Sequence, residues 1–434
     1  MGDHDARDHH ARDGVSAHSD VSRRQFLAGA SLGALAFGLA GCDALLPSAS
    51  PSAAASRAPT PTPTPTASAS PDDSASPSAS TGDDALRRRI AGLLVVGFRG
   101  LGADPDSPIA SDIRDLGLGG VVLFDKDEGT GGVRNIDGPE QLRQLCADLQ
   151  LLATDAQIGG PLIIAVDEEG GAVARLDENH GFPPTQSAAA LGERNNPAVT
   201  KVAASTMAGT LATAGINLNL APVVDLNINP RSPAIGALGR SFSADPKVVV
   251  AQAKAFIQGH RARGIATTLK HFPGHGSATS DTHKGVTDVT ATWKQVELEP
   301  YRQLVAANLA ECVLVAHVFN SKLDPDHPAS LSKPTITGIL RGQLKYGGVV
   351  ITDDLGMGAI TAAYGFEEAL ALALEAGADL LLLANQGSYD DGLPLRAVNA
   401  IAGFVASGRL TKTQIDDASR RVGALRAKLL PGPV

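Results

Sequence analysis

The chain has 434 residues, a formal net charge of −9 at neutral pH and only 4% aromatic residues, with Trp293 as its single tryptophan. This length allows two or three domains, or one large α/β domain with extensions. An acidic chain without a basic cluster excludes nucleic acid as an expected partner, and so few aromatic residues exclude a long cleft paved with stacking platforms.

The first 41 residues resemble a Tat-type lipoprotein signal peptide. Arg23 and Arg24 precede a short apolar run that ends in Leu-Ala-Gly directly before Cys42. Twin arginines before such a run are typical of Tat export, and the run is short for a membrane-spanning helix. The resemblance implies that Cys42 is the first mature residue, carries lipid and holds the protein on the outer face of the cell membrane. A cytosolic chain with an unusual N-terminus is the alternative.

Residues 42–84 are expected to form a flexible linker. Ala, Ser, Thr and Pro dominate from Pro47 onward, and such a segment buries too little apolar surface to offset the entropy lost on ordering. Its Pro-Thr repeats favour extended polyproline II structure. The folded domain is therefore expected at residues 85–434. Its two cysteines, Cys146 and Cys312, lie within apolar patterns, which predicts buried free thiols rather than a disulfide.

Eight short apolar runs predict eight strands. Amphipathic segments at helical spacing separate most of them, and this alternation is typical of a parallel sheet buried on both faces. Eight such units predict a (β/α)₈ TIM-type barrel as a single catalytic domain. An open doubly wound sheet is the alternative, but no GxGxxG motif follows the first strand. The runs are residues 90–98, 119–124, 161–167, 216–226, 264–272, 311–319, 347–354 and 378–385.

Polar residues follow the predicted strands, where a barrel places its active site. Any one of these polar residues could be a helix cap or a surface group, but their convergence at one end of a barrel indicates a site. The polar residues are Asp167, Glu168 and Glu169 after the third strand, Asp225 after the fourth, Lys270 and His271 on the fifth, His317 on the sixth, and Asp353 and Asp354 after the seventh.

The segment LKHFPGHGSATSDTHKG at 269–285 combines three histidines with three glycines in a non-helical run. Metal binding is disfavoured because Phe-Pro-Gly separates His271 from His275, so the two do not share a helical face. Acyl transfer is a weak alternative because the chain has no GxSxG motif and no cysteine in a loop. We therefore expect no metal and no cofactor.

Glycoside hydrolysis fits the segment better. This reaction needs a carboxylate at the anomeric carbon and a proton donor for the leaving oxygen. Asp353 is placed rigidly by its strand, and His283 titrates near neutral pH, with Asp281 two residues away to hold its ring. Glycine permits positive φ and close backbone approach, so a loop could deliver the histidine. The glycines are Gly274, Gly276 and Gly285.

Four motifs together resemble glycoside hydrolase family 3, specifically its single-domain β-N-acetylglucosaminidase branch. They are AVDEEGGAVARL at 165–176, GRSF at 239–242, KHFPGHGSATSDTH at 270–283 and ITDDLGM at 351–357. The resemblance covers residues 88–430. It implies a retaining, exo-acting, monomeric enzyme that removes terminal GlcNAc from peptidoglycan fragments through a glycosyl-enzyme intermediate, with carbohydrate as its substrate.

The resemblance also implies roles for individual residues. Asp353 would be the nucleophile, His283 the general acid/base and Asp281 its partner in a dyad. Met357 would line the subsite. Contacts to the sugar are implied for Asp167, Arg175, Arg240, Lys270 and His271. Three positions depart from the family's usual pattern and bear on substrate preference: Glu168 replaces a common Gln, Gly239 a charged residue and Ser277 a frequent Asp.

Other polar residues near these motifs are expected to be structural. His275 is expected to brace the loop, and His317 to be a hydrogen-bonded histidine at a strand end. Asp354 should face away from Asp353 and could serve as a helix N-cap. For His271, sugar contact and packing both remain open.

Three other functions remain open. A phosphorylase is reasonable because an imidazole base, unlike a carboxylate, does not repel incoming phosphate. A β-glucosidase of the same family is the second. A lipid-anchored sugar-binding protein without turnover is the third, and the presence of Asp353, His283 and Asp281 argues against it.

Overall fold

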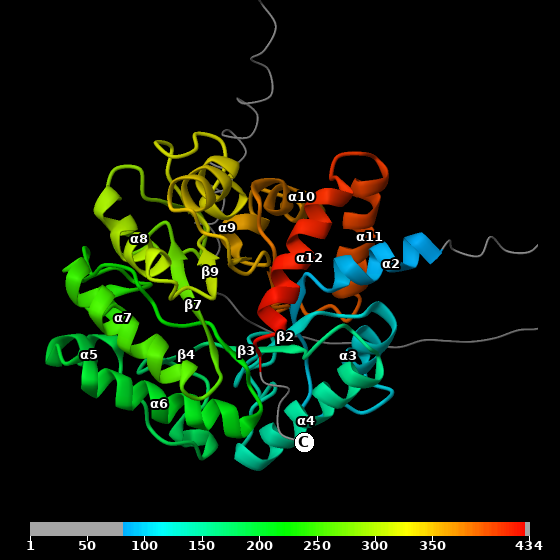
Figure 1. The fold of residues 1–434 in the computed structure, drawn as a ribbon, viewed down its shortest axis with the longest axis horizontal. Helices are drawn as coiled ribbons and strands as arrows, with labels where there is room; N and C mark the ends of the chain where they lie inside the picture. Colours follow the sequence, from blue (N-terminus) through cyan, green and yellow to red (C-terminus); the bar gives the residue numbers. More distant parts are fainter. Residues whose placement is uncertain (1–80, 430–434) are drawn as a thin grey trace, which may run out of the picture.

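The structure, a computed structural model, describes residues 81–429, so the predicted signal peptide, Cys42 and most of the predicted linker lie outside the described residues. The described part forms an eight-stranded parallel barrel with helices around it (Figure 1). The strand order is β11-β9-β7-β6-β3-β2-β1-β12, so strands that follow one another around the barrel also follow one another along the chain. This architecture confirms the predicted (β/α)₈ barrel.

Each barrel strand lies within one of the eight predicted apolar runs. The strands are buried along their whole length, as expected for a parallel sheet covered by helices. Their bounds are β1 Leu94–Gly97, β2 Gly120–Leu123, β3 Ile163–Val166, β6 Leu218–Asn219, β7 Ala266–Phe272, β9 Cys312–Val315, β11 Val349–Thr352 and β12 Leu381–Leu383.

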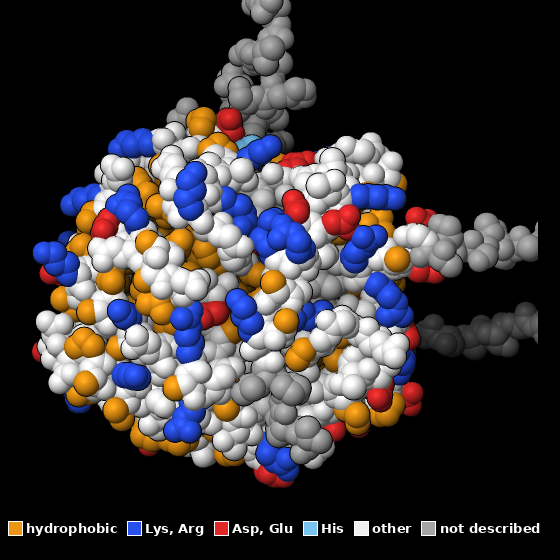
Figure 2. Space-filling view, viewed as in Figure 1, with side chains coloured by type: hydrophobic (Ala, Val, Ile, Leu, Met, Phe, Trp, Pro, Cys, Tyr) orange, Lys and Arg blue, Asp and Glu red, His pale blue; other side chains and the backbone are white. Residues whose placement is uncertain are grey.

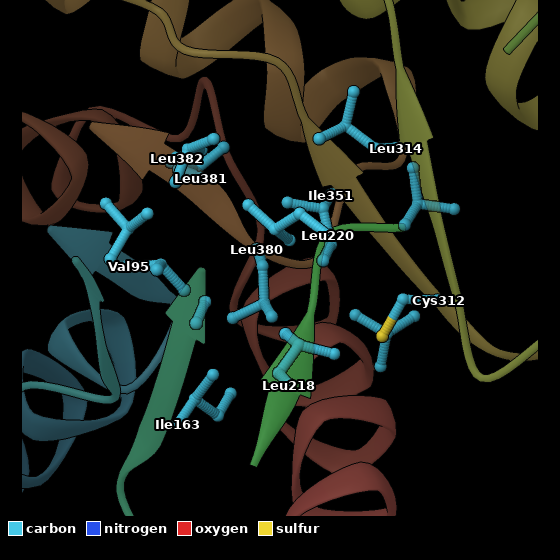
Figure 3. Packing of buried hydrophobic residues seen from close by; sticks show 14 of the residues in the cluster. Val95, Ile163, Leu218, Leu220, Cys312, Leu314, Ile351, Leu380, Leu381 and Leu382 are labelled. Atoms are coloured by element: carbon cyan, nitrogen blue, oxygen red, sulfur yellow. The ribbon is translucent and has the colours of Figure 1, made fainter. Parts of the chain in front are cut away.

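The barrel closes between β11 and β12. The backbone N–H of Thr352 donates to the carbonyl of Leu380 at 3.0 Å, and the N–H of Leu355 donates to that of Leu382 at 3.1 Å. Side chains from opposite walls meet inside the barrel, among them Val95, which lies across from Leu218 in Figure 3. The interior is therefore a packed apolar core, and polar chemistry is confined to its ends.

Helices cover the outside of the barrel. Three of them begin at a side chain that accepts a hydrogen bond from the first turn: Asn196 for α6, Asp245 for α7 and Thr411 for α12. The amphipathic segments of the sequence correspond to α4, α6 and α7. The main outer helices are α4 Pro139–Asp155, α6 Pro197–Ala214, α7 Pro246–Arg261, α8 Glu299–Ala306, η7 Pro334–Gln343, α10 Phe366–Ala376, α11 Leu393–Ala406 and α12 Lys412–Arg426.

Two elements differ in extent from the predicted segments. Helix α2 occupies Thr81–Ala91, so helical structure starts four residues before the predicted domain and the first apolar run starts inside a helix. Asp83 and Asp84 lie in its first turn and stabilise the positive end of the helix dipole. The fourth run is much longer than β6, because Pro222 within it has no N–H to donate to a neighbouring strand.

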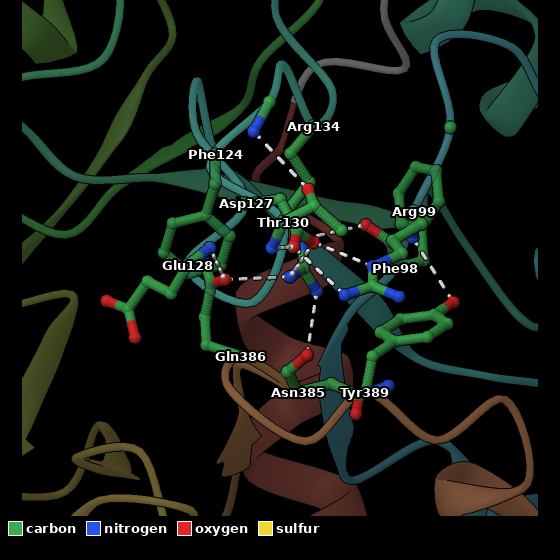
Figure 4. Close-up of polar contacts among 12 residues, drawn as sticks. Phe98, Arg99, Phe124, Asp127, Glu128, Thr130, Arg134, Asn385, Gln386 and Tyr389 are labelled. Atoms are coloured by element: carbon green, nitrogen blue, oxygen red, sulfur yellow. Dashed lines mark hydrogen bonds and ion pairs between the residues drawn. The ribbon is translucent and has the colours of Figure 1, made fainter. Parts of the chain in front are cut away.

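A buried arginine joins three segments near the closing strands. Arg134 is fully buried and donates hydrogen bonds to the carbonyls of Phe98, Ala384 and Asn385 at 2.9, 3.1 and 3.0 Å. It also binds Asp127 at 3.1 Å (Figure 4). Phe98 follows β1 and Ala384 follows β12, so this side chain fixes the loops on one side of the C-terminal rim.

Cys146 and Cys312 are free and buried, as predicted. Cys312 begins β9 and points into the barrel core in Figure 3. Burial raises the pKa of each thiol, so neither is reactive at neutral pH. Across residues 81–429, no helix combines the length and apolar character needed to cross a membrane.

Candidate active site

A cavity of about 170 Å³ lies at the C-terminal end of the barrel strands. A larger cavity, about 500 Å³, lies beside α6, but none of the residues described around it has a titratable side chain. We therefore place the chemistry in the smaller cavity. Its titratable wall residues are Asp167, Glu169, Arg175, Arg240, Lys270, His271, His275, Asp281, His283 and Asp353.

Lys270 lies at the centre of an ion network in the wall. Its Nζ is 2.5 Å from Oδ1 of Asp167 and 2.7 Å from Oε1 of Glu169. Arg240 donates two hydrogen bonds to the same Glu169, at 2.8 and 2.6 Å. Burial opposes ionisation of Glu169, but Arg240 and Lys270 outweigh burial and hold its pKa below the usual range. These fixed charges present preorganised hydrogen-bonding groups to a polar ligand.

Asp225 lies buried behind the cavity and orients two histidines. Its Oδ2 is 2.7 Å from Nδ1 of His271, and its Oδ1 accepts the backbone N–H of His275 at 2.8 Å. Nε2 of His271 lies 3.2 Å from a guanidinium nitrogen of Arg240 at the cavity wall. His271 is thus held in place by Asp225 and Arg240 and lines the cavity as a buried residue.

His275 connects the barrel to the loop. Its Nε2 lies 3.4 Å from Oγ1 of Thr282, one residue before His283. Burial, together with the nearby His271, lowers the pKa of His275 to about 4, so the ring is neutral at neutral pH. These contacts fit the expected bracing role.

Arg175 reaches the cavity from a short hairpin. Strands β4 (Glu168–Gly170) and β5 (Val173–Ala174) pair antiparallel, and Arg175 follows directly. Its Nη1 donates to Oδ1 of Asp125 at 3.2 Å, and its guanidinium lies 5.6 Å from the ring centroid of Phe124. The side chain is therefore held at the wall by groups that follow β2.

Asp353 follows β11 directly, at the cavity floor. Its backbone N–H donates to the carbonyl of Val315 at 3.0 Å, and its Oδ1 accepts the N–H of Asp354 at 3.0 Å. Burial raises the pKa of this carboxyl, but nearby histidines, His317 first among them, lower it more, and the net shift is downward. Asp353 is therefore a fixed, ionised carboxylate.

Asp354 and His317 support Asp353 from behind. His317 has both ring nitrogens engaged, Nδ1 with Oγ of Ser330 at 2.6 Å and Nε2 with the carbonyl of Asp354 at 2.7 Å, which confirms its structural role. The expected N-cap role of Asp354 is wrong, because Met357 caps helix α9 (Gly358–Thr361). Asp354 instead accepts the N–H of Ala384 at 2.8 Å and so ties β11 to the end of β12.

His283 lies on the loop between β7 and β8 (Thr287–Asp288). Its Nδ1 is 2.7 Å from Oδ1 of Asp281, which also accepts the backbone N–H of His283 at 3.0 Å. Burial opposes ionisation of Asp281, but the bonds from His283 lower its pKa overall. The imidazole is 64% exposed, whereas Asp281 is 18% exposed. The pair therefore presents an accessible ring whose Nε2 is free for proton transfer.

Glycines shape the loop in the two expected ways. Gly274 has φ 125° and Gly285 has φ 146°, conformations that other residues rarely adopt. Gly276 does not have positive φ. A Cβ atom there would lie 1.8 Å from the carbonyl oxygen of Leu226, so this glycine permits close packing of the loop on the barrel.

The root of the loop is braced by residues just beyond β8. The indole N–H of Trp293 donates to the carbonyl of Pro273 at 3.1 Å. Glu297, in helix η5 (Gln295–Leu298), accepts the N–H of Lys294 at 3.1 Å through Oε1. Its Oε2 would lie 2.9 Å from a Cβ at Gly274, so the carboxyl fills the space beneath the turn. Burial raises the pKa of Glu297 to about 7.

The cavity gathers all but one of the side chains proposed from sequence. Met357 is buried at the start of α9 and is not among the residues described around this cavity. Sequence reasoning counted Asp225 and Glu169 among the polar residues that converge after the predicted strands but gave neither of them a role. Within residues 81–429, no three His, Cys, Asp or Glu side chains converge as a metal site requires.

Comparisons with known proteins agree with this picture. Residues 85–425 match the Glycosyl hydrolase family 3 N terminal domain. A Beta-hexosaminidase of Xylella fastidiosa (strain M23) is 39% identical over 298 residues, which cover 67% of this chain and 82% of that protein.

Two solved structures are similar in fold. A glycoside hydrolase family 3 beta-N-acetylglucosaminidase from Paenibacillus sp. str. FPU-7 superimposes with a TM-score of 0.72 at 34% identity. The overlap covers 79% of this chain but only 62% of that longer chain. A Beta-N-acetylhexosaminidase from Beutenbergia cavernae DSM 12333 superimposes with a TM-score of 0.70 at 31% identity, over 79% of this chain and 98% of that one.

Proposed function

Because this chain belongs to glycoside hydrolase family 3 and is a glycoside hydrolase of the β-hexosaminidase type, we propose that it removes terminal β-linked GlcNAc from cell-wall fragments with retention of configuration. The observation that carries this proposal is the position of Asp353 and the Asp281–His283 pair around one cavity. An ionised carboxylate at a strand end and an accessible imidazole on a loop are the two groups that the reaction requires.

In the first step, Asp353 attacks the anomeric carbon and forms a glycosyl-enzyme ester. His283 donates the proton from Nε2 to the departing oxygen, so the leaving group departs as an alcohol rather than an alkoxide. The imidazolium that this step needs is stabilised by Asp281, whose carboxylate lies 2.7 Å from Nδ1.

In the second step, the now neutral imidazole accepts a proton from water as the water attacks the anomeric carbon from the face opposite Asp353. The ester bond breaks and the carboxylate returns. Two displacements at one carbon give net retention. Exposure of the His283 ring is consistent with entry of water on its side of the cavity.

The charged wall is the proposed binding surface for the terminal sugar. Lys270 and Arg240 supply donors, while Asp167 supplies an acceptor, and ionic bonds within the wall hold these groups in place. The cavity volume of about 170 Å³ suits one sugar ring rather than an internal stretch of polymer, which favours an exo-acting enzyme.

The cellular setting is a proposal from the sequence. The Arg23-Arg24 pair, the apolar run and Cys42 support export by the Tat route and a lipid anchor on the outer face of the membrane. Residues 43–80 would then link the barrel to the membrane, and peptidoglycan fragments would be the GlcNAc-bearing substrates within reach. We propose that the enzyme acts there as a monomer.

A panel of aryl β-glycosides tests the reaction. GlcNAc, glucose, GalNAc and xylose derivatives would each be assayed in phosphate-free and in phosphate buffer. We expect fastest turnover of the GlcNAc derivative, at a rate independent of phosphate. Preference for glucose would identify a β-glucosidase, and a sugar 1-phosphate product would identify a phosphorylase. If none of the glycosides were turned over, the protein would be a sugar-binding protein rather than an enzyme.

A further inference from the structure

Adjacent glutamates on β4 face opposite ways. Glu169 lines the cavity and binds Arg240 and Lys270. Glu168, its neighbour on an extended strand, points to the other side and is only 1% exposed. The reaction described above does not use Glu168, although a buried carboxyl is costly to keep in a fold.

Glu168 holds the strand that carries Arg175. Its Oε2 accepts the backbone N–H groups of Arg175 at 2.8 Å and Leu176 at 2.9 Å. The backbone of Glu168 is itself fixed by Asn219 on β6, which accepts its N–H at 3.0 Å and donates to its carbonyl at 2.8 Å. The glutamate therefore links Arg175 to the barrel wall.

Two buried polar atoms at this link have no hydrogen-bond partner among residues 81–429. One is Oε1 of Glu168, and the other is Nε of Arg175. The Arg175 guanidinium is held elsewhere, by Asp125 and by the ring of Phe124. The two unpartnered atoms belong to residues that are already joined through the Arg175 backbone N–H, so the Glu168 carboxyl is a second possible partner for the guanidinium besides Asp125.

We propose that Glu168 is a positioning residue for substrate binding, and that its protonation decides whether Arg175 stays at the cavity wall or is drawn back toward the glutamate. This inference rests on the proposed glycosidase function, because it takes Arg175, a residue of the cavity wall, to contact the sugar. Neutral Glu168 leaves the guanidinium with Asp125. Ionised Glu168 is a buried anion that lacks a partner at Oε1, and Arg175 is the cation in reach.

The surroundings of Glu168 favour a change of charge near neutral pH. Burial raises its pKa to about 7, and the negative charge of Asp177 adds to the rise. Hydrogen bonds from the backbone N–H groups of Leu176 and Arg175 lower the pKa, as does the positive charge of Arg175. On the β6 side, Asn219 also contacts His260 at 3.0 Å, but burial lowers the pKa of that histidine to about 4, so it adds no charge.

The test compares wild type with Glu168→Gln over pH 5.5 to 8.5. Gln keeps an acceptor oxygen for the two N–H groups and cannot ionise. With an aryl β-GlcNAc substrate, we expect the ratio of the wild-type KM to the Glu168→Gln KM to rise about fivefold between pH 6 and pH 8.5. The kcat values of the two proteins should change with pH in the same way. Glu193→Gln, an exposed change of the same type on α5 (Ala188–Arg194), should follow wild type.

A second readout does not depend on turnover. The melting temperature of Glu168→Gln minus that of wild type should grow between pH 5 and 8, because only wild type must ionise a buried carboxyl. Parallel KM curves in the two proteins, or a constant difference in melting temperature, would overturn the inference. Wild type without glycosidase activity at any pH would instead contradict the proposed function.

Discussion

Neighbouring carboxylates in this molecule differ in charge state, and the environment of each decides the difference. Glu169 and Asp353 lie beside cations or histidines, which lower their pKa values despite burial. At Glu168 and Asp354, burial outweighs the charges of Arg175 and His283, and the pKa values rise to about 7 and about 6. Each pair thus separates a charged group that faces the ligand from a group that supports the wall.

The proton donor gives a prediction at the same scale. If His283 protonates the leaving oxygen, His283→Ala should lose far more activity on a natural disaccharide than on a dinitrophenyl glycoside, which needs little protonation. We expect a loss on the order of 10³-fold for the disaccharide. Steady-state kinetics on both substrates would measure the difference.

Two further measurements complete this test. Azide should restore breakdown of the glycosyl-enzyme in His283→Ala, since it attacks without a base. The Asp281→Ala, His283→Ala double variant should be little worse than His283→Ala, because the pair acts as a unit. Equal losses on both substrates, with no effect of azide, would place the acid elsewhere and leave these residues a purely structural role.

At the scale of elements, the loop after β7 is held by a small brace at its root as well as by its own contacts. Trp293 holds the carbonyl of Pro273, and Glu297 fills the space beneath Gly274. Beyond the loop, β8 pairs with β10 (Val318–Phe319), which anchors its far end. The exposed His283 is therefore carried between two fixed ends, and its freedom of movement is limited to the residues between them.

The Glu297 brace predicts a pH-dependent stability. Its pKa in the folded protein is about 7, above the usual value of about 4.5, so the folded state binds the proton more tightly. Stability is therefore lost as pH rises from about 4.5 to about 7. Glu297→Gln should match wild type below pH 4.5 and exceed it at pH 8, by up to about 3 kcal/mol.

Urea unfolding at the two pH values measures this difference, and the fluorescence of the single tryptophan reports from the brace itself. Glu193→Gln serves as the matched surface control. If Glu297→Gln were less stable than wild type at pH 8, the carboxylate would be making a favourable ionised contact, and the described brace would be wrong.

The strands of the barrel could be predicted from the sequence more completely than the contacts within the site. Apolar runs between helical segments were enough to place all eight strands, because burial on both faces leaves a strong pattern. The pattern could not show that Glu169 rather than Glu168 faces the cavity, since one residue of register reverses the faces. Nor could it show that Asp225, in the segment after β6, orients His271 in β7 and His275 in the loop after it, which are 46 and 50 residues further along the chain.

At the scale of the whole molecule, the barrel separates stability from chemistry. Its interior is apolar, and its C-terminal rim carries the charged cavity. The buried Arg134 secures one side of that rim by joining the segments after β1 and β12. The start of α2 before residue 85 and the end of β6 before Pro222 leave the predicted architecture unchanged, because neither alters the alternation of strands and helices.

The proposed anchor is also a property of the whole molecule. Cys42→Ala should move the protein from the membrane fraction to the soluble fraction, or leave it unprocessed, because no lipid can be attached. Ser48→Ala, a nearby change that spares the cysteine, should leave fractionation unchanged. The mass of the mature protein gives the independent check, and an unchanged mass and membrane distribution for Cys42→Ala would exclude the lipid anchor.

The central claim is that Asp353 forms a covalent bond to the sugar, and trapping that intermediate tests it most directly. A fluorinated GlcNAc glycoside with a good leaving group should accumulate as a glycosyl-enzyme, because fluorine slows both its formation and its breakdown, whereas the good leaving group restores the rate of formation only. Peptide mapping by mass spectrometry should place one sugar on Asp353, with labelling retained in Asp354→Asn and abolished in Asp353→Asn. A label on Asp354 or Asp167, or full turnover in Asp353→Asn, would contradict the account.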